Sequence, residues 1–478
     1  MNRMKYIRSF VAVFLGCAMA LLQSCERSLS DDFQPATLSE TGEIFIDNFV
    51  GLGTNFYFPF VGDGAKPDVL SVDEQEAFES FASIRIDVPN ADDPSGNFAG
   101  ASLVIDGAGR NLSGFDALTF YAMASQSANI GSLAFGSEFR TAVSNVTFTP
   151  RWTKFIIPIP DPSKLTDVKT VFEFSAGGIG AEGQEVGYTF WIDNLQFENL
   201  GTVAQPRPSI LNGEEVALET FVGARPTITD LAQTFNLATG INQTVSITPA
   251  YLTFSSSDET VATVDESGEV LVTGAGTAEI SAVLAGVRAE GSLMINSEGE
   301  LVLAEEPTLD ASEVLSVFSD SYENVPTDGF NGNFGGQTTQ GGDLNLGENN
   351  IILYTDLNFV GIPMIGTIDA SAFTHLHLDV QVRESVDAGD VLTVELIDFG
   401  PDGVFGGGDD TGGGSNVPDT SLSSFEWVGI DIPLTGFTQG TGGGFAGSPN
   451  VTNIAQVVFV SGNISSIMVD NIYFYSEN

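Results

Sequence analysis

Beyond residue 32, short runs of apolar and β-branched residues alternate with clusters of Gly, Asn, Asp, Ser and Pro. Ser83–Val88, Lys154–Ile157 and Gln456–Val460 are three such runs. Runs of this length, bounded by turn-forming residues, predict β-strands. We find no long stretch with the 3.6-residue apolar period of an amphipathic helix. The 54 glycines fit a chain with many tight turns, and we therefore predict an all-β protein.

The pattern occurs twice, which indicates an internal duplication. Each copy has a strand preceded by a phenylalanine, then a Trp-containing segment, and finally a closing strand with an Asp-Asn pair. The matching segments are Asn111–Ala124 with Asp369–Val382, Arg151–Pro158 with Glu426–Pro433, and Trp191–Phe197 with Met468–Phe474. The second copy also has an added Gly- and Asp-rich segment, Asp398–Asn416. One fold is therefore predicted to be used twice.

The region between the two copies has a different pattern. Phe254–Val270 contains an SSD-x-x-VAxVD-x-x-G sequence, and Gly274–Ile280 follows with GxGxAxI. This region resembles the bacterial Ig-like domain of the group-2 type. The resemblance implies a β-sandwich that separates the flanking modules as a spacer.

The flanking copies resemble jelly-roll carbohydrate-binding modules, especially those found with laminarinase-like enzymes and in surface glycan-binding lipoproteins of Bacteroidota-type polysaccharide-utilisation systems. The segments that carry the resemblance are Val317–Tyr322, Leu357–Ile362, Thr374–Asp379, Val469–Phe474 and, more loosely, Tyr188–Phe197. The resemblance implies capture of a neutral polysaccharide, such as a laminarin-type β-glucan. It also implies an outer-membrane transporter complex and surface hydrolases as partners.

The N-terminus has the features of a bacterial export signal. Basic residues precede an apolar run too short to span a bilayer as a helix, and the run ends in a lipobox-like sequence before Cys25. We expect cleavage before Cys25 and acylation of that residue. The acidic segment Ser28–Asp32 resembles the export signals of Bacteroidota-type lipoproteins, which implies the outer face of the outer membrane. The alternative is an ordinary signal peptide with an incidental cysteine.

These features divide the chain into five parts and predict two jelly-roll β-sandwiches separated by an Ig-like β-sandwich. The predicted boundaries are a signal peptide at 1–24, a tether at 25–40, a carbohydrate-binding-like sandwich at 41–200, an Ig-like domain at 205–300 and a second carbohydrate-binding-like sandwich at 305–478.

Charge narrows the range of partners. The chain has 63 Asp and Glu against 16 Lys and Arg, a net charge of −47 and a pI near 4.1. Nucleic acids are disfavoured because phosphate binding requires clustered basic residues. Anionic polysaccharides are disfavoured as well. A neutral partner remains.

Hydrolysis of a glycoside typically requires two carboxylates across a cleft. The Glu-x-Asp-x-x-Glu motif of jelly-roll laminarinases is absent, and His375 and His377 are the only histidines. We therefore predict a non-catalytic protein. An unfamiliar carboxylate pair in an unrecognised glycosidase, and a structural or adhesive surface protein, are the alternatives.

Sugar rings stack on aromatic side chains, and their hydroxyls bond to amides and carboxylates. Aromatic residues in polar or Gly-rich segments are therefore candidate ligands, as are His375, His377 and Asp379, which share one face of a predicted strand. Alternatively, the rings cover the sandwich edge and the tryptophans close it. The candidate glycan-binding residues are Tyr57, Phe58, Phe330, Asn331, Phe334, Gln337, His375, His377, Asp379 and Trp427.

Calcium is a candidate structural ion. It binds six to eight oxygen atoms, and the added Gly-rich segment provides Asp398, Asp402, Asp409 and Asp410 close together. The spacing differs from that of an EF-hand. The alternative is a solvated acidic loop.

Overall fold

The computed structural model describes residues 39–180, 184–332, 334–406, 408–445 and 447–477. The predicted signal peptide, most of the tether and the predicted lipidation site Cys25 lie outside these residues. The described chain is built from strands and short 3-10 helices, without an α-helix, so the all-β prediction is confirmed. None of its helices is long and apolar enough to cross a membrane.

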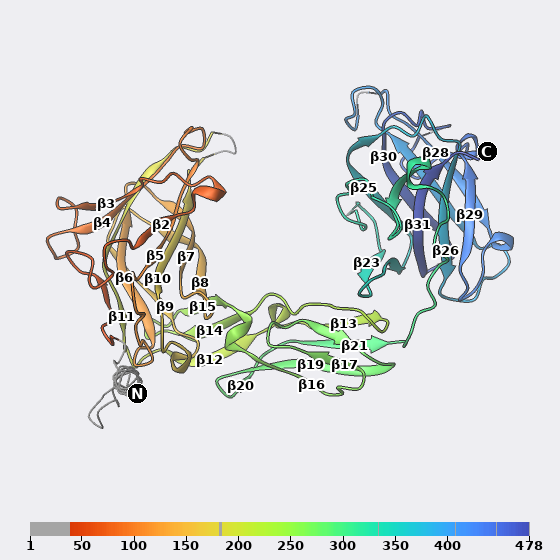
Figure 1. Ribbon diagram of the computed structural model, residues 1–478. Coiled ribbons are helices and arrows are strands. Elements are labelled where there is room, and N and C mark those ends of the chain that lie inside the picture. Colours follow the sequence, from red (N-terminus) through yellow and green to blue (C-terminus); the bar gives the residue numbers. More distant parts are fainter. Residues whose placement is uncertain (1–38, 181–183, 333, 407, 446, 478) are drawn as a thin grey trace, which may run out of the picture.

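Two β-sandwiches lie at the ends of the molecule, with a third between them (Figure 1). The first sheet of the N-terminal sandwich has the order β3 (Leu70–Asp73), β4 (Ser83–Val88), β11 (Tyr188–Glu198), β6 (Ala117–Ala124), β9 (Thr153–Pro158), with β1 (Glu43–Phe45) on β11. Its second sheet has the order β2 (Tyr57–Pro59), β5 (Phe98–Val104), β10 (Thr170–Gly177), β7 (Ala128–Phe135), β8 (Thr141–Phe148).

The C-terminal sandwich repeats this topology, which confirms the duplication. Its first sheet has the order β23 (Gln340–Asn345), β24 (Asn350–Thr355), β31 (Ile467–Tyr475), β26 (His375–Val382), β29 (Val428–Pro433), with β22 (Val314–Phe318) on β31. Its second sheet has the order β25 (Phe359–Ile368), β30 (Ile454–Gly462), β27 (Val391–Asp398), β28 (Thr411–Pro418).

The middle region contains two smaller sheets and also extends the N-terminal sandwich. Its own strands are β13 (Glu215–Thr220), β21 (Ser292–Ser297), β19 (Gly276–Leu284), β16 (Thr253–Ser256) and β20 (Val287–Arg288), with β17 (Ala262–Val264) and β18 (Val270–Val272) as a separate pair. Strands β12 (Ala204–Ser209), β14 (Ala232–Asn236) and β15 (Asn242–Ile247) instead continue the sheet that ends in β8. Hydrogen-bonded sheet therefore runs across the predicted boundary at 200–205.

Short 3-10 helices join several strands. They are η1 (Val61–Asp63), η2 (Pro162–Lys164), η3 (Leu211–Gly213), η4 (Pro249–Tyr251), η5 (Ala311–Glu313), η6 (Asp419–Ser421) and η7 (Leu434–Gly436).

Strand alternation separates the core from the outer faces of each sandwich. In the C-terminal sandwich, Val457 and Phe459 of β30 belong to the same hydrophobic core as Leu376 and Leu378 of β26, and all four are fully buried. The residues between them on each strand therefore point away from the core.

Each sandwich closes on a strand in which Asp is followed by Asn with a left-handed φ of +50°. Asn tolerates this conformation better than most residues. Asp193 is fully buried and accepts hydrogen bonds from the Phe78 N–H and the Ser80 hydroxyl, each at 2.7 Å. Its counterpart Asp470 accepts from the Asn471 N–H. Burial, together with the nearby Asp320 and Asp379 carboxylates, raises the pKa of Asp470 to about 7.

We therefore predict that Asp470→Asn stabilises the C-terminal sandwich above pH 7. The folded-state pKa exceeds the unfolded one, so the native state binds the extra proton and loses stability as pH rises from about 4 to about 7. A shift of this size corresponds to at most ~4 kcal/mol. Thermal unfolding between pH 4 and 9 measures the effect.

The matched variant is Asp193→Asn in the other sandwich. Both Asp193 oxygens accept hydrogen bonds, one from Phe78 and Ser80 and the other from the Asn194 N–H, so the NH2 of the new amide would face a donor in either orientation, and the variant should destabilise the protein across this pH range. Equal effects of the two variants at pH 8 would contradict the assignment.

Candidate functional site

A groove of about 530 Å³ lies on the outer face of the sheet β25-β30-β27-β28. Strands β30 and β27 form its floor, with the outward residues Gln456, Val458, Val460, Glu395 and Ile397. Phenylalanine rings are its most frequent lining side chains. They are Phe334, Phe359, Phe399, Phe405 and Phe445.

The rings stand on two sides of this floor. On the β25 side, Phe359 is part of the strand, and the ring of Phe334 lies over Gly361. A Cβ atom at Gly361 would meet that ring at 2.7 Å, so the absence of a side chain there lets the ring rest on the sheet. On the β28 side, a Cβ atom at Gly412 would lie 3.1 Å from Cβ of Phe445.

The wall on the β28 side is a Gly-rich segment, 437–445, that packs on the edge of the sheet. Gln439 and Gly414 exchange backbone hydrogen bonds at 2.9 Å. A Cβ atom at Gly413 would meet the carbonyl oxygen of Phe437 at 2.3 Å, so only glycine fits under this wall. The three consecutive glycines at 412–414 thus allow loop backbone and side chains to approach the strand closely.

Glu395 connects the floor to this wall. Its side chain is 4% exposed, and Oε1 accepts a hydrogen bond from the Gly442 N–H at 2.9 Å. Burial raises the pKa of this carboxyl above its ordinary value, opposed by the Gly442 hydrogen bond. Glu395 is the one carboxylate among the described residues that line the groove.

The corresponding face of the N-terminal sandwich has different chemistry. Ser102 of β5 pairs with Glu173 of β10, and Glu173 pairs with Ala134 of β7. Glu173 accepts hydrogen bonds from Ser102 and from Arg140, each at 2.9 Å. The outer face of this N-terminal sheet therefore has small and charged side chains, whereas the floor of the C-terminal groove has valine and isoleucine beside Glu395.

The structure brings four predicted residues together at the β25 end of the groove. Phe334 lines it, and Asn331 and Gln337 hydrogen-bond to each other in the loop that presents this ring. Phe330 packs edge-to-face on Phe318 of β22 at 4.9 Å and belongs to the core margin. Of the four, Phe334 alone lines the groove, and its neighbours position its loop.

His375, His377 and Asp379 lie on β26, whose outer face is on the opposite side of the sandwich. His377 Nδ1 is 2.8 Å from Asp431 Oδ1, and its ring stacks on Tyr473 at 4.8 Å. Burial lowers the pKa of His377, but the Asp379 and Asp431 carboxylates outweigh burial and raise it. His377 and Asp379 lie 3.6 Å apart, whereas the His375 ring contacts Thr374 and Tyr475, so all three have polar partners away from the groove.

The remaining predicted aromatic residues are also distant from the groove. The Trp427 indole N–H donates to the Val302 carbonyl at 2.7 Å, in the linker before the C-terminal sandwich. Phe58 is 43% exposed on β2 of the N-terminal sandwich, opposite Ser102. Its neighbour Tyr57 is half-buried, and burial raises the pKa of its hydroxyl to about 12.

Sequence reasoning missed most of the groove. Phe399 and Phe405 lie within the Gly- and Asp-rich segment Asp398–Asn416, where the sequence directs attention to the Asp residues as calcium ligands. Phe445 lies in a second Gly-rich run, so the pattern that singled out Phe334, a ring among glycines, also marks these positions. Glu395 and Gln456 lie on ordinary strands and have no such signal.

Three of the four predicted calcium ligands accept hydrogen bonds from backbone N–H groups in or near their own loop. Asp398 is fully buried, and its two oxygens accept the Gly400 N–H at 2.9 Å and the Asn453 N–H at 2.7 Å. Asp402 accepts the Val404 N–H and Asp410 accepts the Gly406 N–H. Gly400 lies close to the Asp409 carboxylate. In the described part of the chain, no group of three or more His, Cys, Asp or Glu side chains is placed to hold a metal ion, and calcium binding stays a prediction.

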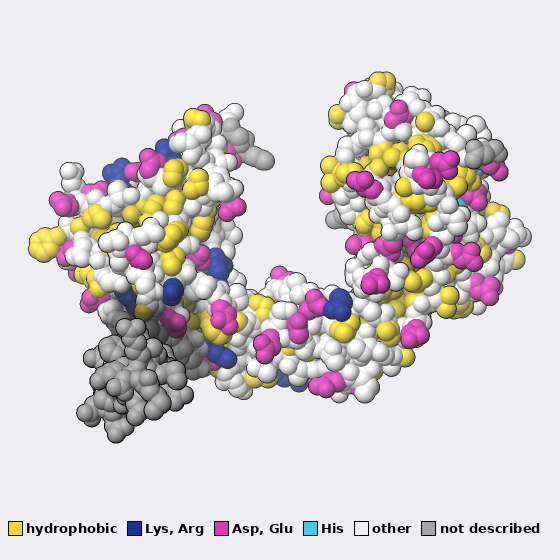
Figure 2. All heavy atoms as spheres, in the orientation of Figure 1, with side chains coloured by type: hydrophobic (Ala, Val, Ile, Leu, Met, Phe, Trp, Pro, Cys, Tyr) yellow, Lys and Arg dark blue, Asp and Glu magenta, His cyan; other side chains and the backbone are white. Residues whose placement is uncertain are grey.

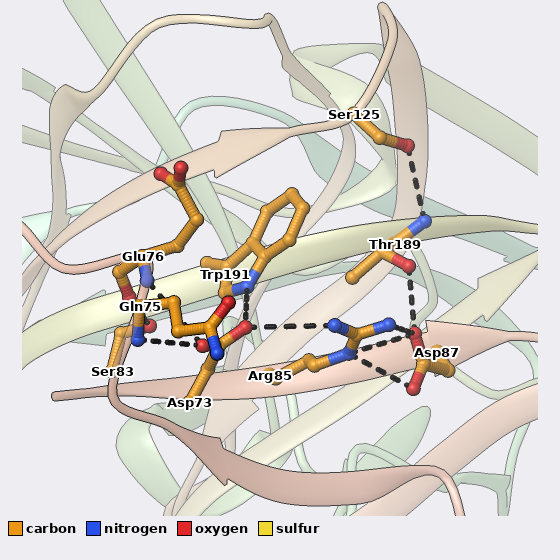
Figure 3. Close-up of polar contacts among 9 residues, drawn as sticks. All are labelled: Asp73, Gln75, Glu76, Ser83, Arg85, Asp87, Ser125, Thr189 and Trp191. Carbon is orange, nitrogen blue, oxygen red and sulfur yellow. Dashed lines mark hydrogen bonds and ion pairs between the residues drawn. The ribbon is translucent and has the colours of Figure 1, made fainter.

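A second polar cluster covers the outer face of β4 and β11 in the N-terminal sandwich (Figure 3). Arg85 pairs with Asp87 at 2.9 Å and with Asp73 at 3.5 Å, and the Trp191 indole N–H donates to Asp73 at 3.0 Å. Thr189 donates to Asp87 at 2.6 Å. One arginine therefore pairs with two aspartates, and neutral donors from Thr189 and Trp191 bond to the same carboxylates.

Comparison with known families gives one match. Residues 246–286 match the family described as intimin, immunoglobulin-like domain. The match lies within the predicted Ig-like region and supports an Ig-like domain there. No curated protein matches the chain.

Several solved structures are similar to part of the chain. A family 30 carbohydrate-binding module is 19% identical, with 33% of this chain and 86% of that chain covered, at a TM-score of 0.25. The family 11 module of the cellulosomal cellulase Lic26A-Cel5E of Clostridium thermocellum is 17% identical, with 37% and 97% covered, at 0.25. A β-1,2-glucanase from Parabacteroides distasonis is 12% identical, with 54% and 39% covered, at 0.25.

We predict that Gly413→Ala displaces the 437–445 wall, because its Cβ would overlap the Phe437 carbonyl oxygen. Hydrogen exchange should accelerate at the Gln439 and Gly442 amides, and the melting temperature should fall. The control is Gly442→Ala, whose Cβ would meet no atom within 4 Å and which keeps the N–H that bonds to Glu395. Equal exchange in both variants would contradict this packing.

Proposed function

We propose that the chain is a non-catalytic glycan-binding protein and that its C-terminal groove holds a neutral polysaccharide. The observation that carries the proposal is the set of phenylalanine rings on two sides of a sheet floor that contains one buried carboxyl. Aromatic rings stack on the C–H faces of sugars, and a few polar groups orient the hydroxyls. The Phe-rich lining favours the C-terminal sandwich over the N-terminal one as the main binding module.

The two-sided arrangement favours a β-linked glucan, and we propose laminarin as the first to test. In β-linked glucose the ring hydroxyls are equatorial, so both faces of the ring present C–H groups. An axial hydroxyl, as in galactose or mannose, would place a polar group against an aromatic wall and lose its water without a partner. Glu395 and Gln456 on the floor are available for the equatorial hydroxyls.

Charge supports a neutral ligand. Arg383 is the only Lys or Arg in residues 305–478. On the face shown in Figure 2, basic side chains gather on the N-terminal sandwich and the Ig-like domain, whereas the C-terminal sandwich shows acidic and hydrophobic ones. A uronic or sulfated chain would meet the Glu395 carboxyl with no cation among the groove's described lining residues.

Binding without hydrolysis is favoured because hydrolysis typically uses a pair of carboxylates, and Glu395 is the one acid among the described lining residues. A β-glucan glycosidase is the second candidate, and release of reducing ends from the bound glycan would identify it. A structural or adhesive role would leave the groove without a glycan ligand.

The proposal includes the cellular setting. Acylation of Cys25 would anchor the protein in the outer membrane, facing the cell exterior, with the body held close to an outer-membrane transporter complex and surface hydrolases. Loss of membrane association in Cys25→Ala, with retained glycan binding, is the expected result in fractionated cells.

We predict that laminarin or a mixed-linkage β-glucan retards the purified protein in native gels, whereas alginate and carrageenan do not. Phe334→Ala and Phe445→Ala should each weaken binding by about 3- to 10-fold, the value of one aromatic contact. Phe81→Ala, which changes an 85% exposed ring on the N-terminal sandwich, is the control. Unaltered mobility across neutral glucans, mannans and xylans would overturn the proposal.

Gly361→Ala tests the stacking geometry without removing a ring. Its Cβ would displace the Phe334 ring from the sheet, so binding should weaken about as much as in Phe334→Ala, by roughly 3- to 10-fold. Gly114→Ala in the N-terminal sandwich is the control, because its Cβ would meet no atom within 4 Å and it lies outside the groove. Isothermal titration calorimetry with the retarding glucan measures both.

A further inference from the structure

The Ig-like domain and the C-terminal sandwich share an apolar cluster. Phe221, which follows β13, is 3% exposed and packs with Ile351 of β24 and Met468 of β31, both fully buried. Leucines from the linker and from the β23–β24 hairpin surround these three residues. They are Leu301, Leu303, Leu344, Leu346 and Leu353.

Arg383 seals the edge of this cluster. Its guanidinium pairs with Glu298 of the linker and donates to the Gln381 amide oxygen at 2.7 Å. It also lies between two rings, 5.1 Å from the centroid of Phe221 and 5.6 Å from that of Phe425. The side chain is 11% exposed, so the only Lys or Arg of the C-terminal sandwich is mostly covered at its contact with the preceding domain.

The linker itself is bound along its length. The Trp427 indole N–H holds the Val302 carbonyl, the Asn471 amide holds the Glu305 carbonyl at 3.2 Å, and the Tyr322 hydroxyl holds the Leu309 carbonyl at 3.0 Å. A flexible tether would leave these carbonyls to water. Trp427, a candidate glycan ligand by sequence, here fixes the linker.

The other junction is fixed by backbone and side-chain bonds. Strand β15 pairs with β8 through Ser246 with Ala142 and Ile247 with Thr141. Tyr251 is 2% exposed, and its hydroxyl lies 3.0 Å from both the Phe139 carbonyl and the Thr141 hydroxyl.

Interfaces between domains of one chain ordinarily permit relative motion unless they are large and hydrophobic. Here one junction is a continuous sheet, and the other combines an apolar cluster with a mostly covered arginine. We infer that the three sandwiches move as one rigid body, in which Arg383, Phe221 and Trp427 fix the direction in which the C-terminal groove opens. This inference goes beyond glycan binding and does not depend on it.

The test is a distance measurement between spin labels in the full chain. With Cys17 and Cys25 replaced by Ser, labels are placed at Val61→Cys and Ile365→Cys, which are 56% and 65% exposed on the two outer sandwiches. The expected result is one narrow distance peak. Arg383→Ala combined with Trp427→Ala should replace it with a broad distribution.

Arg288→Ala is the matched control, because Arg288 forms its ion pair with Glu279 inside the Ig-like domain. It should leave the narrow peak unchanged. Circular dichroism shows whether the double variant folds. If it does not, Phe221→Ala, which removes the Ig-like domain's ring from the apolar cluster, replaces it in the test. A broad distribution in the parent chain, or a narrow one in the folded double and Phe221 variants, would overturn the inference.

Discussion

The groove depends on close approach between loops and the outer face of one sheet. Gly361 on β25 and Gly412 and Gly414 on β28 leave the outer face bare at its two sides, and Phe334 and the 437–445 wall occupy those places. Gly413, between them, points to the core side of the sheet and admits the Phe437 backbone there. Larger side chains in place of these glycines would push Phe334 and the 437–445 wall away from the sheet that forms the floor of the groove. Because Val458 and Glu395 lie between the bare positions in the same row across the sheet, the same arrangement makes an apolar floor with one carboxyl.

The two copies show how one topology serves different purposes. Their first sheets have the same strand order, and the four strands β25-β30-β27-β28 correspond to β5-β10-β7-β8, to which the N-terminal copy adds β2 at one edge and β15-β14-β12 at the other. The outer faces differ, because outward residues are free of core packing. Glu173 in the N-terminal copy is paired with Arg140, whereas Glu395 has a backbone N–H partner and faces the groove. The other outer face of the C-terminal copy carries Met468 and Leu353 where the N-terminal copy carries Trp191 and Arg85, and only the former packs on the Ig-like domain.

The sequence was sufficient for the fold because strand alternation, turn residues and an internal repeat are local signals. Val457 and Phe459, with outward neighbours between them, show that alternation in the printed sequence. The site was harder to predict because its lining residues come from three strands and three loops, and sheet order decides which of these lie close together. Phe334 was identified because it lies among glycines. His375 and His377 were assigned correctly to one strand face, but which side of the sandwich that face occupies depends on the pairing of β26 with β31 and β29.

Sheet-edge packing also explains why the position of a tryptophan in the sequence did not identify a glycan-binding residue. Trp152 and Trp427 occupy equivalent positions before equivalent strands, yet Trp427 is held by a linker carbonyl and Trp152 lies 6.0 Å from Phe78 in an aromatic cluster with Tyr121. A large ring at a sandwich edge packs against whatever segment passes over it, and that segment differs between the copies. In the C-terminal copy the segment is the linker, so the ring that sequence reasoning gave to a sugar instead fixes the orientation of the module that carries the groove.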